Sequence, residues 1–196
     1  MSFKICVSGA AEGGCLTPET LKKAEKVGEA IAKEGAILVT GATSGIPHAA
    51  TKGAKEAGGI SIGFSPAASR VDHINRYKLP TKYLDLTVYT GFGYAGRNLI
   101  LTRSADAVII ICGRIGTLNE FTVAFEDKKP IGVLEESGGM ADEIEEITRI
   151  AHKHECRVLY EADPKKLVGQ LIDDLKQKHK EDAEKLAPAT TVQNPE

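Results

Sequence analysis

The sequence has little net charge and no long apolar run, and each of these shortages excludes a class of protein. Its 25 lysines and arginines against 27 aspartates and glutamates leave a formal net charge of −2. This balance gives no broad basic field, so we expect no nucleic-acid partner. The longest apolar run is too short to span a bilayer, and the N-terminus leads directly into a strand pattern. We therefore expect neither a membrane partner nor a signal segment.

Cysteine is also scarce, and its spacing is uninformative. The chain has four cysteines and no Cys-x-x-Cys motif: Cys6, Cys15, Cys112 and Cys156. This pattern favours reduced thiols in a cytoplasmic protein over a disulfide framework. For Cys112, which follows an apolar run, a small buried side chain is favoured over a reactive thiol.

Familiar nucleotide and metal motifs are missing as well. The stretch Gly9-Ala-Ala-Glu-Gly13 lacks the middle glycine of G-x-G-x-x-G, which argues against a hydride-transfer dinucleotide site. No segment matches G-x-x-x-x-G-K-[ST], which argues against a P-loop kinase or NTPase. His152 and His154 are two residues apart on an expected helix and point to different faces, so we predict no metal site.

What the chain does have is a regular alternation of strand and helix patterns. Short apolar runs bounded by glycine and polar turns alternate with helical periodicity, and the turns between them are short. This predicts an α/β fold: a single doubly wound, Rossmann-like domain with a mostly parallel sheet flanked by helices. We place the domain at 1–179 and expect a disordered tail at 180–196. The expected strands are 4–8, 37–40, 60–64, 83–89, 107–111, 130–134 and 157–160.

Residues 65–82 break this alternation. The segment is long and polar, with basic side chains such as Arg70, Arg76 and Lys78, and it lies on the carboxyl side of a strand. Long loops in compact domains are functional lids or simply mobile surface segments. The sequence leaves both interpretations open.

Four glycine-containing loops follow strands, at 9–14, 41–45, 91–96 and 113–116. In open α/β sheets, ligands bind beyond the carboxyl ends of the strands, where the strand order reverses. Glycine loops that lead into helices bind anions through free backbone N–H groups, so these loops favour a phosphorylated ligand over plain turn chemistry. The binding residues they predict are Gly9, Gly41, Ser44, Gly45, Gly113, Arg114, Gly116 and Thr117.

The central stretch of the chain runs from Gly96 to Glu126. The apolar run 107–111 predicts a buried strand, and Thr117 can cap a helix that starts at Leu118. Arg97 and Glu120 bracket the loop and could form an anion clamp with a carboxylate beside it. Such a pair could act on a sugar phosphate at its anomeric bond. The alternatives are structural: Thr117 and Glu120 fit a capping box, and Arg97 could be an ordinary surface arginine.

These residues resemble a known family. The stretch from Arg97 to Asp106 and the stretch from Gly113 to Glu120 resemble the Lonely-guy (LOG) family pattern R-K-x-x-M-x-R-x-A-D followed by P-G-G-x-G-T-x-x-E. The family cleaves the N-glycosidic bond of nucleoside 5′-monophosphates to free base and ribose 5-phosphate. The resemblance implies that Arg97 and Glu120 are catalytic and that the loop 113–117 binds phosphate. It also places Gly41 and Gly45 in the family's upstream glycine motif.

The sequence departs from that pattern in informative ways. Asn98 stands where the family has lysine, Cys112 where it has proline, and Arg114 where it has a glycine. The stretch Ser137–Asp142 is similar to a sister branch of the Rossmann-type SLOG superfamily, the molybdenum-cofactor carrier-like proteins. Two functions therefore stay open: hydrolysis of a nucleoside monophosphate, or non-enzymatic binding of a phosphorylated pterin or nucleotide. No cofactor is required by either, molybdenum cofactor is a possible ligand, and the family implies a homo-oligomer, either dimer or tetramer.

Overall fold

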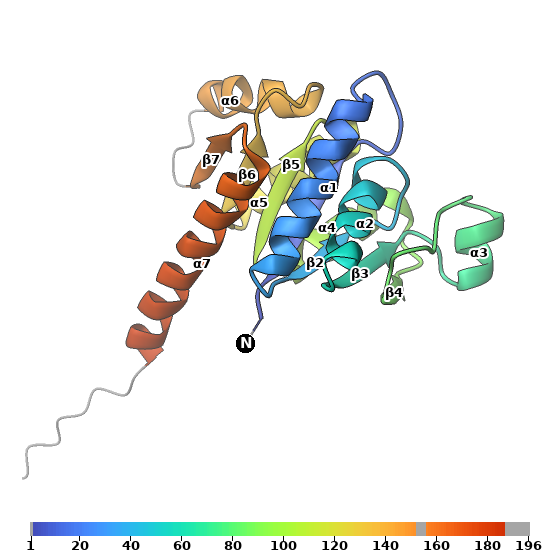
Figure 1. The fold of residues 1–196 in the computed structure, drawn as a ribbon, viewed down its shortest axis with the longest axis horizontal. Coiled ribbons are helices and arrows are strands. Elements are labelled where there is room, and N and C mark those ends of the chain that lie inside the picture. The colour runs from blue at the N-terminus through green and yellow to red at the C-terminus, as the bar shows by residue number, and fades with distance from the viewer. Residues whose placement is uncertain (1, 152–155, 187–196) are drawn as a thin grey trace, which may run out of the picture.

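Seven parallel strands form the centre of the molecule in the computed structural model, which describes residues 2–151 and 156–186 (Figure 1). The strand order is β4-β3-β2-β1-β5-β6-β7, and every neighbouring pair is parallel. This confirms the predicted doubly wound sheet, which is parallel throughout rather than mostly. The strands are β1 (Lys4–Gly9), β2 (Ile37–Thr40), β3 (Ile60–Ser65), β4 (Leu86–Tyr89), β5 (Ala107–Ile111), β6 (Ile131–Leu134) and β7 (Val158–Glu161).

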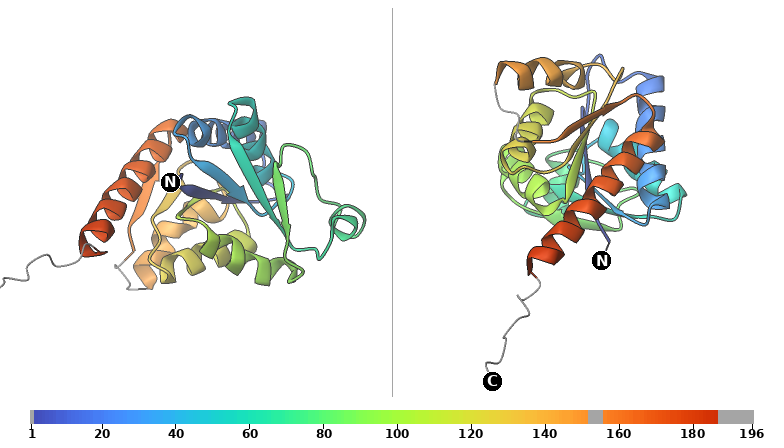
Figure 2. Two further views of the ribbon diagram at one scale, coloured as in Figure 1. Left: turned by 90° about the horizontal axis from the view of Figure 1, so that it is seen from below. Right: turned by 90° about the vertical axis from the view of Figure 1, so that its left-hand side faces the viewer.

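Helices cover both faces of this sheet, as the end-on view of Figure 2 shows. One face packs against α1 (Pro18–Lys33), α2 (Ile46–Glu56) and α7 (Pro164–Leu186). The other face packs against α4 (Gly93–Ser104), α5 (Ile115–Glu126) and α6 (Met140–Ile150). All five residues of β5 are fully buried, and they alternate between the two cores. This double burial is the physical reason for the uninterrupted apolar run in the sequence.

The strand order reverses between β1 and β5. From β1 the chain builds outward to β2, β3 and β4, and it then returns to the other side of β1 with β5. The loops that follow β1 and β5 therefore diverge to opposite faces and leave a crevice at the carboxyl edge of the sheet. This is the place where open α/β sheets bind ligands.

Two parts of the chain differ from the sequence-based expectation. Helix α7 continues to Leu186, so the predicted disordered tail at 180–196 begins too early. Its residues 187–196 lie outside the described residues, as do His152 and His154. The segment 65–82 contains a short helix, α3 (Arg70–Asn75), which the sequence did not predict.

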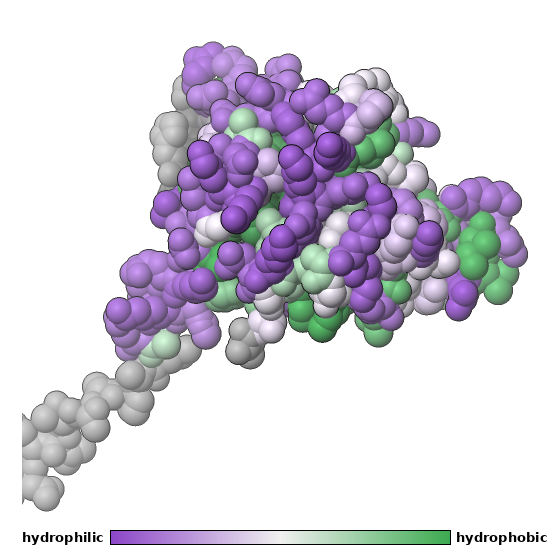
Figure 3. Space-filling view, viewed as in Figure 1, coloured by the Kyte–Doolittle hydropathy of each residue, from purple (hydrophilic) through white to green (hydrophobic). Residues whose placement is uncertain are grey.

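The surface in Figure 3 is hydrophilic over most of the face formed by α1 and α7, with an apolar spot at α3. Val71 and Ile74 are the exposed apolar residues of that helix. Within the described part of the chain, no helix combines the length and the apolar character that crossing a bilayer requires.

Candidate functional site

A cavity of about 630 Å³ lies at the carboxyl ends of β1 and β5. Its wall is formed by residues 7–12, by parts of the loop and helix start at 41–47, by 77–79, and by residues of α4 and α5. The volume lies within the range typical of small-molecule sites. The cavity is therefore the candidate site, at the position where the strand order predicts one.

Arg97 and Glu120 meet inside this cavity. Arg97 comes from α4 and Glu120 from α5, and Arg97 Nη1 lies 3.1 Å from Glu120 Oε1. The two side chains are only 6% and 8% exposed. Arg97 is thus no ordinary surface arginine. The structure brings the two predicted catalytic residues together.

Two further side chains hold the Glu120 carboxylate. Ser8, at the end of β1, donates its hydroxyl hydrogen to Glu120 Oε2. In the orientation that satisfies its neighbours, the Asn98 amide donates to Glu120 Oε1 and to the Tyr94 carbonyl oxygen, both at 2.9 Å. Both carboxylate oxygens therefore accept hydrogen bonds from the protein.

Burial dominates the electrostatics of Glu120. Removal from water raises the pKa of this carboxyl group, and the charge of Arg97 and the hydrogen bond from Ser8 only partly oppose the rise. A buried carboxyl group with a raised pKa is typical of acid–base sites, although structural ion pairs show it too.

Gly41 makes room for the guanidinium group. A Cβ atom at position 41 would lie 2.7 Å from Arg97 Cζ and closer still to Nη1. Any side chain here would displace the arginine. Arg97 Nε is buried and, among the described residues, has no hydrogen-bond partner. An unpaired buried donor is costly, so a ligand oxygen at this nitrogen would be stabilising.

Helix α5 begins earlier than the sequence predicts. The chain turns at Cys112 and Gly113, with φ of 54° and 107°, and Arg114 becomes the N-cap residue. The first helical hydrogen bond runs from Leu118 N to Arg114 O, at 3.0 Å. Thr117 therefore lies inside the first turn and does not cap the helix. The predicted capping box is wrong, because the Glu120 carboxylate contacts Ser8 and Arg97 instead of reaching back to Thr117.

This early start points the helix N-terminus at the cavity. The N–H groups in the first turn of a helix have no intrahelical partners, and the helix dipole adds positive potential there. Six of the eight predicted binding residues line the cavity: Gly9, Gly41, Ser44, Arg114, Gly116 and Thr117. Gly45 and Gly113 do not line it. They lie where φ is positive and shape the turns behind its wall.

The segment 65–82 contributes one end of the cavity wall. Tyr77, Lys78 and Leu79 line the cavity, and the Tyr77 ring meets the Tyr94 ring edge to face at 5.6 Å. The buried His73 fixes this segment, since its Nδ1 lies 2.8 Å from Ser65 Oγ and its Nε2 lies 3.1 Å from Pro80 O. These contacts make the segment a fixed part of the cavity wall, in contrast to the mobile surface loop that the sequence left open.

Sequence reasoning missed four residues of this site: Ser8, Tyr77, Tyr94 and Asn98, which it noted only as a departure from the family pattern. A serine at the end of a strand belongs to no motif, and its partner Glu120 is 112 positions away. A sequence signal existed for the two tyrosines, because Tyr77 follows β3 and Tyr94 follows β4. Segments that follow parallel strands lie at the carboxyl edge of the sheet, where the ligand was expected.

The structure also corrects the prediction of reduced thiols. Cys15 and Cys112 form a disulfide, with their Cα atoms 6.0 Å apart and their positions 97 apart in sequence. Cys6 and Cys156 are free; Cys6 is buried and Cys156 is half-buried. Among the residues described, no cluster of three or more His, Cys, Asp and Glu side chains could hold a metal ion.

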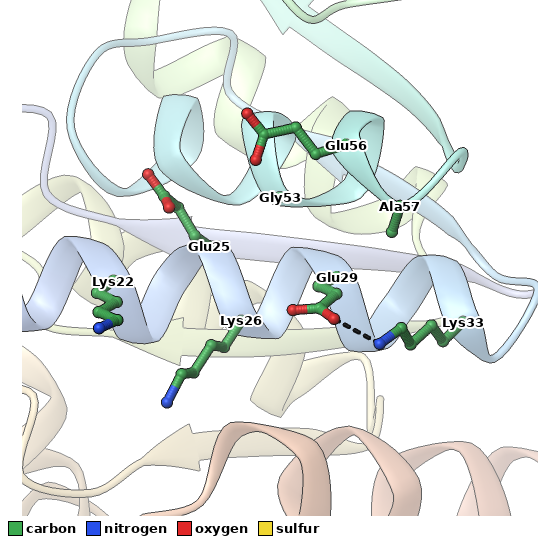
Figure 4. A pocket seen from close by; sticks show the side chains of 8 residues that line it. All are labelled: Lys22, Glu25, Lys26, Glu29, Lys33, Gly53, Glu56 and Ala57. Atoms are coloured by element: carbon green, nitrogen blue, oxygen red, sulfur yellow. Dashed lines mark hydrogen bonds and ion pairs between the residues drawn. The ribbon is translucent and has the colours of Figure 1, made fainter.

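A second hollow, of about 450 Å³, lies between α1 and α2 (Figure 4). Charged side chains of the outer face of α1 border it, and its dashed contact joins Glu29 to Lys33 at 2.5 Å. Both of these side chains are exposed, so the hollow is a solvated groove with an ordinary surface ion pair. It holds no buried polar group comparable to Arg97 or Glu120.

Comparisons with known proteins identify the family of the chain. Residues 2–168 match the model of the SLOG cluster4 family. An uncharacterized protein from Archaeoglobus fulgidus is 32% identical over 132 residues, which make up 67% of this chain and 82% of that protein.

Two similar structures have named ligands. The molybdenum cofactor binding protein from the phototrophic bacterium Rippkaea orientalis matches with a TM-score of 0.72 and 30% identity, over 90% of this chain and 98% of that one. The molybdenum cofactor carrier protein from Chlamydomonas reinhardtii matches with a TM-score of 0.70 and 28% identity, over 90% and 99%. These matches confirm the resemblance to the carrier-like SLOG proteins.

Proposed function

The chain belongs to the SLOG cluster4 family, and we propose that it binds a small phosphorylated heterocycle, a pterin or a nucleotide, in the cavity at β1 and β5. The observation that carries this proposal is the meeting, in one cavity, of the α5 N-terminus with the buried Arg97–Glu120 pair. An anion site and a polar recognition pair thus share one space of ligand size.

The phosphate would bind at the start of α5. Backbone N–H groups at Ile115, Gly116 and Thr117 belong to the first turn, where a phosphate is stabilised by hydrogen bonds and by the helix dipole. Arg114 lines the same end of the cavity and can add a charged contact. Arg97 lines the same cavity and supplies a second positive charge.

The planar ring would bind near the two tyrosines. Tyr77 and Tyr94 line the cavity, and Tyr94 is 51% exposed, with the Arg97 Cζ atom 5.9 Å from its ring centroid. Aromatic side chains stack on flat heterocycles of many kinds. The pair therefore supports a heterocyclic ligand without separating a pterin from a nucleobase.

Binding without turnover is the function we favour. Both oxygens of Glu120 already accept hydrogen bonds from Ser8, Arg97 and Asn98, which suits a carboxylate that orients a ligand. The two similar proteins with named ligands bind or carry molybdenum cofactor, and nearly their whole length is matched. We therefore propose a carrier or binder of such a phosphorylated pterin or a related nucleotide.

The first test identifies the ligand directly. Native mass spectrometry of the freshly purified protein should show a copurifying phosphorylated heterocycle. A saturating ligand, at about a hundredfold excess over its Kd, stabilises the folded state by about 2.7 kcal/mol, which a thermal shift detects. AMP serves as the second probe. Absence of any copurifying ligand, together with no shift for AMP or for a pterin monophosphate, would exclude the proposal.

A matched pair of arginine variants locates the phosphate. Arg114→Met should weaken AMP binding roughly tenfold, the order expected for loss of one charged contact of about 1.5 kcal/mol. Arg103→Met is the control, because Arg103 is exposed and pairs with Asp127 on the outside of α4 and α5. Equal affinities in the two variants would place the phosphate elsewhere.

Hydrolysis of a nucleoside 5′-monophosphate is the second candidate function. The raised pKa of Glu120, in contact with Arg97 inside the cavity, favours it, since such a carboxyl group can exchange a proton with water or a sugar. Incubation with AMP should then release adenine, and Glu120→Gln should abolish the release. Adenine release that survives Glu120→Gln would remove Glu120 from the mechanism.

A further inference from the structure

We propose that the Cys15–Cys112 disulfide is a redox control of ligand affinity in this cavity. The inference rests on the proposed function, because the property it controls is ligand binding. The bond joins the loop after β1 to the end of β5, the two strands between which the strand order reverses. It therefore links the two sides of the crevice that hold the ligand site.

Both linked loops form the cavity wall. The loop after β1 contributes Ala10, Ala11 and Glu12, and the segment after β5 contributes Arg114 and the first residue of α5, Ile115. A covalent bond between them fixes the separation of the two sides, with 6.0 Å between the Cα atoms of the cysteines. The width of the phosphate end of the cavity thus depends on this bond.

The two ends of the bond are anchored unequally. Cys112 is held by its own backbone: its N–H donates to Ser137 Oγ and its carbonyl oxygen accepts from Ala141 N, both at 2.8 Å. The neighbouring Gly113 carbonyl oxygen accepts from Met140 N at 3.1 Å. The start of the glycine loop therefore keeps its place whether or not the disulfide is closed.

The Cys15 end is held mainly by the bond, because its other backbone hydrogen bonds, from Leu16 N to Gly13 O and from Thr17 N to Cys15 O, both at 3.1 Å, stay within this loop. Ala10 and Ala11 are tied to the next loop, since their carbonyl oxygens accept from Ile46 N at 2.9 Å and from Ser44 Oγ at 3.0 Å. Beyond them, Glu12 reaches the opposite side through an ion pair with Arg114 whose two side chains are 80% and 57% exposed. Exposed pairs of this kind contribute little to stability. Opening the disulfide would therefore release residues 12–15 and loosen that wall of the cavity.

The exchange chemistry follows from accessibility. Cys15 is partly exposed and Cys112 is fully buried, so an external thiolate would attack the Cys15 sulfur. The S–S bond breaks, Cys112 leaves as a thiolate and takes up a proton, and a mixed disulfide remains on Cys15. The second thiol of a dithiol reductant then attacks that mixed disulfide and frees Cys15. Two electrons and two protons pass to the protein, and a small-molecule disulfide reverses the reaction.

The consequence for binding is one of preorganisation. With the bond closed, the wall is already in place when a ligand arrives. With the bond open, binding must also order residues 12–15, and that entropic cost lowers affinity. We expect reduced protein to bind AMP about tenfold more weakly than oxidised protein.

The test titrates AMP into the full chain in both redox states. Calorimetry gives the affinity before and after treatment with a dithiol, and intact mass confirms the gain of two hydrogens. Cys15→Ser should bind as weakly as the reduced wild type and should not respond to the dithiol. Cys156→Ser is the matched control, because Cys156 is free and half-buried and does not line the cavity, so this variant should respond as the wild type does.

Hydrogen exchange separates this inference from the proposed function. Reduction should speed amide exchange in residues 11–16 and leave the Cys112 N–H, which donates to Ser137 Oγ, protected with or without a ligand. If AMP fails to bind in either state while this exchange pattern appears, the nucleotide part of the proposed function fails and the structural effect of the bond stands. Equal AMP affinity in verified oxidised and reduced protein, or unchanged exchange in 11–16, would overturn the inference.

Discussion

Two arginine–glutamate ion pairs border the same cavity. Their nitrogen–oxygen distances are similar, but their exposure to water is very different. Arg97–Glu120 spans 3.1 Å with side chains that are 6% and 8% exposed. Arg114–Glu12 spans 2.9 Å with side chains that are 57% and 80% exposed. The two distances would suggest ion pairs of equal strength, but water surrounds only the second pair and weakens its electrostatic attraction.

The buried pair is fixed and the exposed pair is adjustable. Removing one partner of a buried pair leaves a charge stranded away from water, whereas an exposed partner is simply rehydrated. The first pair therefore specifies the geometry of the site, and the second can exchange its carboxylate for a ligand phosphate at little cost. Four experiments would break or sharpen this contrast.

The largest difference should appear in stability. Arg97→Met should lower the free energy of unfolding by about 3–5 kcal/mol, because Glu120 then stays buried without its counter-charge. Arg114→Met should change it by less than about 1 kcal/mol. Urea unfolding at neutral pH measures both. The double variant Arg97→Met/Glu120→Gln should recover part of the loss, and equal effects of the two single arginine variants would refute the contrast.

The next effect concerns the hydroxyl that supports the buried pair. Ser8→Ala should cost about 1–3 kcal/mol of stability, because a buried carboxylate oxygen loses its donor. It should also raise the pKa of Glu120 further, since the Ser8 hydrogen bond lowers that pKa. Ser104→Ala is the control, because the Ser104 hydroxyl donates to the Ile100 carbonyl oxygen of its own helix at 2.7 Å. A loss no greater than that of the control would show that Ser8 gives no support.

A pH series gives a smaller effect with a defined sign. Burial raises the folded-state pKa of Glu120 above the ordinary 4.5, so the folded protein holds this proton more tightly than the unfolded chain does. The stability this provides is present in acid and is lost as the pH rises through the folded pKa. The free energies of unfolding of the wild type and of Glu120→Gln should therefore diverge as the pH rises, with the variant becoming the more stable of the two.

A surface carboxyl group supplies the opposite sign for that series. The hydrogen bond from Arg149 lowers the pKa of Glu146, so its contribution is present above the unfolded pKa and disappears as the pH falls. Glu146→Gln should thus lose relative stability at neutral pH, by a small amount because the pair is exposed. The same slope in both variants would contradict the assigned pKa directions.

The smallest effect should come from the exposed carboxylate. Glu12→Gln should leave stability within about 0.5 kcal/mol of wild type. It should tighten AMP binding about twofold to threefold at low salt, because Arg114 no longer has a competing carboxylate. The gain should vanish in high salt, where exposed charges are screened. Weaker binding would mean that Glu12 itself contacts the ligand.

Much of the fold was predictable from local pattern. The run Ala107–Ile111 is apolar because both faces of β5 are covered, and such runs identify buried strands without tertiary knowledge. Helix α1 begins as Thr17 and Pro18 predict, with the Thr17 side chain accepting from Thr20 N. Helix α3 escaped because it is six residues long and buries only His73, too little to leave a periodic signal.

The site was predictable only in part, since its key contacts are distant in sequence. Arg97 and Glu120 were predicted from the resemblance to a known family. They meet because α4 and α5 place them both at the carboxyl edge of the sheet. The start of α5 was wrong because Cys112, a non-glycine residue, takes a positive φ that propensity does not foresee. The disulfide was missed because no spacing rule connects cysteines on two loops that meet only through the strand order.

The glycine at position 41 makes two distant parts of the chain, the loop after β2 and helix α4, depend on each other. Even a methyl group there would occupy the volume of the Arg97 guanidinium, so the missing side chain of Gly41 is what leaves space for the arginine of α4. A larger residue at position 41 would displace the Arg97 side chain. A shorter residue at position 97 would leave an empty space beside Glu120. We therefore expect positions 41 and 97 to be substituted together or not at all in proteins related to this chain.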